Sequence, residues 1–204
     1  MSLEKFEAFI ALTYARGIYG KSHSTDFLWN KTYGPKIFGE TMSRSDYKKI
    51  HRFIRFDNRS TRSERIKSDK FTHIREIFDL FVENCRGAYI PTNSLTIDEQ
   101  LLPMKNRCPF IVFMPNKPDK FGMKFWILAE VKLKYIVNVI PYLGALEKES
   151  RLGVPLAEHV VLNLTEVVQN KGYNVTTDNF FYLSSSCKET LRQSNFNCWY
   201  CESK

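Results

Sequence analysis

The spacing of hydrophobic positions changes near residue 90. Before this point apolar side chains recur every three or four residues, as at Leu3, Phe6 and Ile10, which predicts amphipathic helices. After it, short runs rich in β-branched and aromatic residues alternate with turn residues, which predicts strands. We therefore expect a mixed α+β protein, with a helical region over residues 1–90 and a sheet-containing region over residues 91–204.

Three helices are expected in the first region. One begins at about Leu3 and ends before Gly17, and a second begins near Ser43, where a hydroxyl can cap it. The third carries its apolar residues on one face over residues 74–85. The polar segments 21–42 and 57–69 between these helices are rich in turn residues or charges, which predicts loops.

The second region is predicted to have the order β-β-β-β-α-β-α. The successive strands are "SLTIDEQLL", "FIVFM", "KFWILAEV", "YIVNVIPYL" and, after a helix that begins near Pro155, "YNVTTD". A final helix is expected over "SSSCKETLRQ".

Two acids stand out by their position in these strands. Asp98 lies inside the first strand beside Leu95 and Ile97, and Asp178 ends the last strand. If the two strands are neighbours, both carboxylates can project from the same edge of the sheet, where they repel each other unless a cation lies between them. Mg²⁺ suits such a pair. The ordinary alternative is two strand-end acids that meet water or a helix N-terminus, and the residues alone favour it.

Positive charge is concentrated in one part of the chain. Residues 44–75 contain eleven Lys or Arg and four acids, which accounts for seven of the eight net positive charges. Such clustering indicates contact with DNA phosphates, although a solvated helix face explains it equally well. The candidate DNA-binding residues are Arg44, Lys48, Lys49, Arg52, Arg55 and Arg59, together with Lys105, Arg107, Lys117 and Lys120 behind the first strand.

Other features of the sequence exclude several classes of function. The longest uncharged apolar run is shorter than the roughly 20 residues that span a bilayer, so no membrane contact is expected. No pattern typical of a small-molecule site is present. Cys198 and Cys201 form a CxxC pair that lacks the two further ligands of a zinc site. Phe180, Phe181 and Tyr182 can stack on an unpaired base, although core packing is the commoner role of such residues.

Several long segments resemble the transposase domain of the piggyBac family. They are "MSRSDYKKIHRFIRFDN", "LTIDEQLLPMKNRCPF", "MPNKPDKFGMKFW", "GVPLAEHVV" and "TTDNFFYLSSSCKETL". The resemblance implies a cut-and-paste DNA transposase with an RNase H-like core that uses Mg²⁺ or Mn²⁺. It identifies Asp98 and Asp178 as the first and second catalytic and metal-binding aspartates. It also implies double-stranded DNA of transposon ends as the partner, residues 1–90 as a dimerisation and DNA-binding region, a homodimer, and a nuclear location.

The sequence departs from the family pattern in one respect. The family has a third catalytic Asp well downstream, but the only acids that follow Asp178 are Glu189 and Glu202. We therefore expect a core that is incomplete at its C-terminus, in a DNA-binding remnant with little or no activity alone. The alternatives are an active enzyme that receives a third carboxylate from another chain, and a fragment without function.

Overall fold

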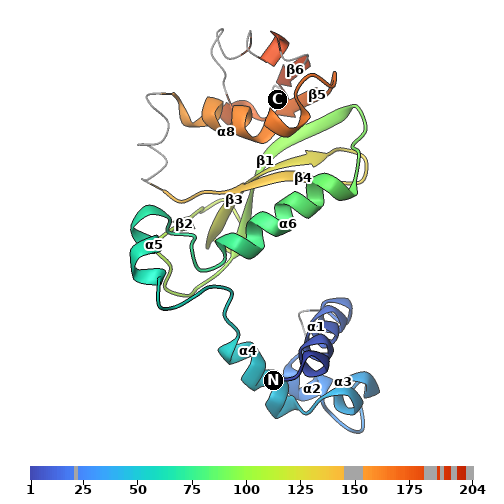
Figure 1. Cartoon of the computed structure of the whole chain (residues 1–204). Helices are drawn as coiled ribbons and strands as arrows, with labels where there is room; N and C mark the ends of the chain where they lie inside the picture. Colours follow the sequence, from blue (N-terminus) through green and yellow to red (C-terminus); the bar gives the residue numbers. More distant parts are fainter. Residues whose placement is uncertain (21–22, 145–153, 182–187, 189–190, 194–196, 201–204) are drawn as a thin grey trace. The chain divides into compact units, whose positions relative to one another are not determined.

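The computed structural model describes residues 1–20, 23–144, 154–181, 188, 191–193 and 197–200. The chain forms two compact units, Met1–Arg55 and Phe56–Lys204 (Figure 1). The sequence predicts a boundary at residue 90 between two regions of different expected roles, and the fold does not test those roles. The compact units divide earlier, after Arg55. The reason is that the last helix before residue 90 packs on the sheet that follows it.

Residues 1–20 and 23–55 of the first unit form four helices around a core of aromatic and aliphatic side chains. The helices are α1 (Leu3–Ile18), α2 (Thr25–Leu28), α3 (Lys36–Thr41) and α4 (Arg44–Phe53). The hydroxyl of Ser43 accepts a hydrogen bond from the N–H of Asp46 and caps α4 as expected. The predicted loop over residues 21–42 is wrong in part. Leu28 and Phe38 are completely buried, and the two short helices α2 and α3 place them in the core.

The second unit begins with two helices and continues with a mixed sheet. The helices are α5 (Arg62–Ser68) and α6 (Arg75–Ala88). The strands are β1 (Ser94–Pro103), β2 (Ile111–Phe113), β3 (Phe121–Glu130), β4 (Ile136–Pro141), β5 (Asn174–Thr177) and β6 (Asn197–Tyr200). Helix α5 lies where a loop was predicted, so that prediction is wrong. The α+β class and the expected order of the first five strands are confirmed.

The sheet combines antiparallel and parallel pairs. Its order is β2-β3-β1-β5-β6, and β4 pairs with β3 as well. β3 is antiparallel to β1, β2 and β4, whereas β5 is parallel to both β1 and β6. The first and last predicted strands, β1 and β5, are therefore neighbours.

Helices cover both faces of this sheet. Trp126 and Leu128 of β3 share a core cluster with α8 (Leu156–Thr165) and with the short helix η1 (Glu166–Val168) that follows it. Phe125 points to the opposite face, since side chains alternate along a strand, and its ring stacks against Phe78 of α6. The helix predicted over residues 184–193 falls mostly outside the described residues. Among the described residues, no helix is long and apolar enough to cross a membrane.

Candidate metal and DNA-binding site

Asp98 and Asp178 lie side by side at the place where β5 ends. The parallel register pairs Thr96 with Thr176 and Ile97 with Thr177, and each aspartate is the next residue of its strand. β5 stops at Thr177, whereas β1 continues to Pro103, so the flank of β1 is no longer paired with β5 beyond this point. The predicted proximity of the two acids is confirmed.

A third carboxylate joins them. Ligand atoms of Asp98, Glu99 and Asp178 all lie within 4.8 Å of one another. One oxygen of each aspartate is held by the backbone. Asp98 Oδ1 accepts from the N–H of Glu99 at 2.7 Å, and Asp178 Oδ1 accepts from the N–H of Phe180 at 3.1 Å. Within the part of the chain that the structure describes, no partner is recorded for the second oxygen of either aspartate, which can face a cation.

Glu99 was not assigned a role by the sequence reasoning. Its side chain is only 17% exposed, and the ammonium of Lys117 lies 3.4 Å from its Oε1. The alternation along the strand could have indicated a role, because Glu99 lies on the same face of β1 as the buried Leu95 and Ile97. An acid on the inward face of a strand requires a positive partner. Lys117 supplies that partner here.

The three carboxylates fit a hard divalent cation. Mg²⁺ and Mn²⁺ prefer oxygen ligands, and Mg²⁺ is commonly held by one or two carboxylates plus water and substrate phosphates. Two or three acids at an open sheet edge leave space for such additional ligands. The donor set therefore suits a divalent ion that also contacts a phosphate.

The basic residues of α4 lie in the first unit, on an exposed surface of that helix. Arg44, Lys48 and Arg52 follow one another at four-residue steps, and together with Lys49 and Phe53 they border a shallow hollow. Arg44 also forms an ion pair with Asp26. Four cations on one helix, only one of them in an ion pair that the structure records, form a surface suited to a polyanion.

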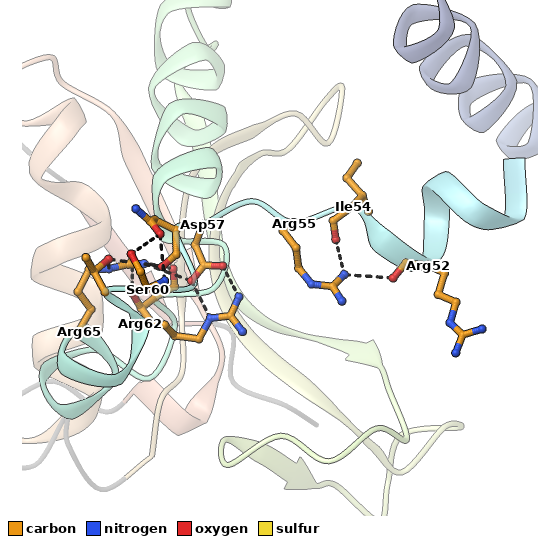
Figure 2. A network of polar contacts seen from close by, with 10 residues as sticks. Arg52, Ile54, Arg55, Asp57, Ser60, Arg62 and Arg65 are labelled. Carbon is orange, nitrogen blue, oxygen red and sulfur yellow. Dashed lines mark hydrogen bonds and ion pairs between the residues drawn. The ribbon is translucent and has the colours of Figure 1, made fainter. Parts of the chain in front are cut away.

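Two further predicted residues lie near the boundary between the units. The guanidinium of Arg55 donates to the backbone oxygens of Arg52 and Ile54 at 3.1 and 2.7 Å, as Figure 2 shows, and so occupies the C-terminal end of α4. Arg59, which belongs to the second unit, is exposed. Arg55 therefore has a structural contact in the first unit, and its DNA-binding role stays a prediction, as does that of Arg59.

Other arginines of the basic segment hold the fold of the second unit together. The carboxylate of Asp57 is 2% exposed and accepts from Arg62 Nε at 2.8 Å and from Arg65 Nη2 at 3.2 Å (Figure 2). The hydrogen bond from Arg62 is the main reason why the pKa of Asp57 falls from 3.8 to about 2. Arg65 also donates to the hydroxyl of Thr72. Arg62 and Arg65 thus stabilise α5 and its surroundings. The number of basic residues in segment 44–75 is therefore larger than the number whose charge is left for DNA.

The remaining predicted contacts lie on the second unit. Lys105 and Lys120 border a hollow of about 520 Å³ together with Pro118 and Asp119. Lys117 pairs with Glu99, as described above, and Arg107 is an exposed residue between β1 and β2. Of these four predicted cations, Lys117 has a recorded contact with one of the acids, whereas Lys105 and Lys120 line a hollow whose lining includes none of the three carboxylates.

Comparison with known proteins identifies the family. A family model described as Transposase IS4 matches residues 1–199. The chain superposes on a piggyBac transposase solved as a synaptic complex with hairpin DNA, with a TM-score of 0.84 and 34% sequence identity. This protein belongs to the piggyBac-type transposase family. The match covers 97% of this chain and 40% of that transposase, so the chain spans less than half the length of its relative.

The fold expected from the resemblance is likewise confirmed by this match. Two Mos1 transposase complexes, one paired-end and one pre-cleavage, also align, but TM-scores of 0.32 and 0.31 with 11% and 10% identity are too low to carry an argument. Glu189, Glu202 and Cys201 lie outside the described residues. The predictions that concern them therefore stay predictions.

Proposed function

We propose that this chain binds double-stranded DNA, in particular transposon ends, and holds a divalent metal ion at Asp98 and Asp178 beside a DNA phosphate. The observation that carries the proposal is the register that sets these two acids next to each other in a transposase fold. The metal would be Mg²⁺ or Mn²⁺. When bound, it would stabilise charge on the attacking and leaving oxygens of a phosphoryl transfer.

The chain's own residues account for the placement of the DNA. On the first unit the exposed cations of α4 would contact phosphates, and on the second unit Lys105, Arg107 and Lys120 would do so. Such contacts fix the register of a protein on the duplex without reading its sequence. Asp98 and Asp178 would each direct one free oxygen towards the metal, since the other oxygen is held by a backbone N–H.

We further propose that these 204 residues cut DNA slowly or not at all by themselves. The third carboxylate of the cluster, Glu99, is paired with Lys117, so two acids of this cluster of described residues remain without a basic partner. In-line transfer requires that both reacting oxygens are held firmly, and looser coordination weakens that hold. The alternative is activity with a third carboxylate supplied by another chain. A homodimer and a nuclear location are further proposals, supported only by the family.

Plasmid nicking tests the proposal most simply. Supercoiled plasmid is incubated with the protein and Mg²⁺ or Mn²⁺, beside the double variant Asp98→Asn/Asp178→Asn, and DNA binding is measured in parallel. We expect both proteins to bind DNA and neither to nick it appreciably. Strong nicking by the wild-type chain alone would overturn the proposal of low activity, whereas loss of all DNA binding would overturn the DNA-binding role.

A further inference from the structure

Phe180 and Phe181 have opposite environments although they are adjacent in the short helix η2 (Asn179–Phe181). The ring of Phe181 is completely buried and lies edge-on to Trp126, with ring centroids 5.4 Å apart. The ring of Phe180 stacks on Trp126 at the same distance and at an interplanar angle of 19°, but it is 50% exposed. Phe181 therefore belongs to the core, and Phe180 presents an aromatic surface to solvent.

The exposed ring is held in a fixed relation to the candidate metal ligand Asp178. The N–H of Phe180 donates to Asp178 Oδ1 at 3.1 Å, and the N–H of Phe181 donates to the backbone oxygen of Asp178 at 3.1 Å. The stack on Trp126 fixes one face of the ring, and the backbone hydrogen bond links Phe180 to the carboxylate of Asp178. Whatever contacts the ring lies beside the metal ligands.

A positive charge lies next to the same ring. The ammonium of Lys124 lies 3.7 Å from the ring centroid of Trp126 and 5.2 Å from that of Phe180. Lys124 and Trp126 share one face of β3 and lie opposite Leu101 and Glu99 of β1. A flat apolar surface, a cation and a cluster of carboxylates that can hold a metal thus adjoin one another. Together they match a flat ring attached to a phosphate.

We propose that the exposed face of Phe180 stacks on an unpaired DNA base next to the phosphate held at the carboxylates. The inference rests on the proposed DNA-binding function and adds a specific subsite to it. Aromatic side chains stack on any base, because every base has a π-face, and removal of such a contact costs about ten-fold in affinity. Lys124 adds a charge that favours the attached phosphate.

The test compares two DNA probes of one sequence. One is a fully paired duplex, and the other carries a single unpaired 2-aminopurine, whose fluorescence falls when it stacks on an aromatic ring. Wild-type protein should bind the second probe more tightly and quench it. Phe180→Leu keeps the cover over Trp126 but removes the stacking surface, so it should lose about ten-fold in affinity for the unpaired probe only. Phe180→Tyr should retain the wild-type behaviour.

A matched control is available on α6. Phe81 is 51% exposed, so Phe81→Leu makes the same chemical change at the same exposure, and it should alter neither affinity. A second measurement needs no variant: 5-iodouracil at the unpaired position should crosslink on irradiation to the peptide that contains Phe180.

Three results would overturn the inference while leaving the proposed function intact. The first is binding of the unpaired probe without quenching, and the second is a crosslink to another part of the chain. The third is an affinity of Phe180→Leu for the unpaired probe that equals that of the wild type. If the wild-type protein bound neither probe, the proposed function and the inference would both be wrong.

Discussion

Asp98 and Asp178 are the first residues beyond the last paired position of two parallel strands, Ile97 with Thr177. The register of this one strand pair therefore brings together two carboxylates that are eighty residues apart in the sequence. The side chain of each aspartate is tied to a backbone N–H one or two residues further along the chain. The backbone thus contributes directly to the geometry of the site, through the strand register and these two hydrogen bonds.

Removal of the Lys117 charge should strengthen metal binding. Lys117 lies 3.4 Å from Glu99 Oε1 and competes with a metal ion for that oxygen. We expect Lys117→Met to raise the affinity for Mn²⁺ by up to about five-fold, as for the loss of a partly exposed ion pair. Calorimetric titration of Mn²⁺ into both proteins measures this. Unchanged or weaker binding would show that Glu99 does not contribute to the site.

The basic residues of α4 should govern how DNA binding depends on salt. Each lost phosphate contact reduces the slope of log affinity against log salt by about 0.9. The variant Lys48→Ala/Lys49→Ala/Arg52→Ala should therefore flatten the slope by two to three such steps. Its control is Arg65→Ala, which should lower the melting temperature because Arg65 holds Asp57, and should leave the slope unchanged. Equal slopes for the wild type and the triple variant would contradict the assignment.

The Asp57 network should make stability depend on acidity. The pKa of Asp57 is about 2 in the folded chain and 3.8 when unperturbed, so its stabilising effect is complete above about pH 4 and disappears as the pH falls towards 2. Asp57→Asn should melt at a lower temperature than wild type at pH 7. The difference should narrow between about pH 4 and pH 2. Melting curves over this range, followed by circular dichroism, would refute the account if the difference stayed constant.

Gly122 should not tolerate a side chain. A Cβ at this position would lie 2.2 Å from the backbone oxygen of Leu102, so Gly122→Ala must push β3 away from β1. We expect a loss of about 1–3 kcal/mol, as for other overpacked sites. Gly17→Ala is the control, because nothing lies within 4 Å of the added Cβ in α1 and alanine favours helix. Urea unfolding distinguishes them, and equal stability of Gly122→Ala and wild type would contradict this packing.

The parts of the fold that sequence could predict depend on local pattern. The alternation around Asp98 and the short run that ends at Asp178 were sufficient to locate β1 and β5. That the two strands are neighbours was a condition of the sequence argument, and the structure supplies it through their parallel register. Helix α5 could not be predicted, because its sequence is polar apart from Ile66 and it is held by contacts of Asp57 with Arg62 and Arg65. Asp57 lies outside α5, so the hydrophobic pattern of the helix itself does not reveal these contacts.

The candidate site was likewise predicted only as far as local sequence pattern reveals it. Asp98 inside the first strand and Asp178 at the end of the last are visible in the sequence pattern, whereas Glu99 is recognisable only once Lys117 is known to lie beside it. Likewise, the sequence shows the net positive charge of segment 44–75, but it does not show which of these basic side chains form ion pairs within the fold and which are exposed. Arg62 and Arg65 are ion-paired with Asp57, and Lys48 and Lys49 are exposed. Three-dimensional contacts, not composition, make that distinction.

The central claim is that Asp98 and Asp178 together bind one metal centre. Iron-directed cleavage tests it most directly: Fe²⁺ replaces the divalent ion, and ascorbate with peroxide then breaks the protein backbone close to the bound iron. We predict cuts near residues 98 and 178 in the wild-type chain, and loss of both cuts in Asp98→Asn and in Asp178→Asn. Cuts that persisted at one position after the other aspartate was replaced, or cuts elsewhere alone, would contradict the claim.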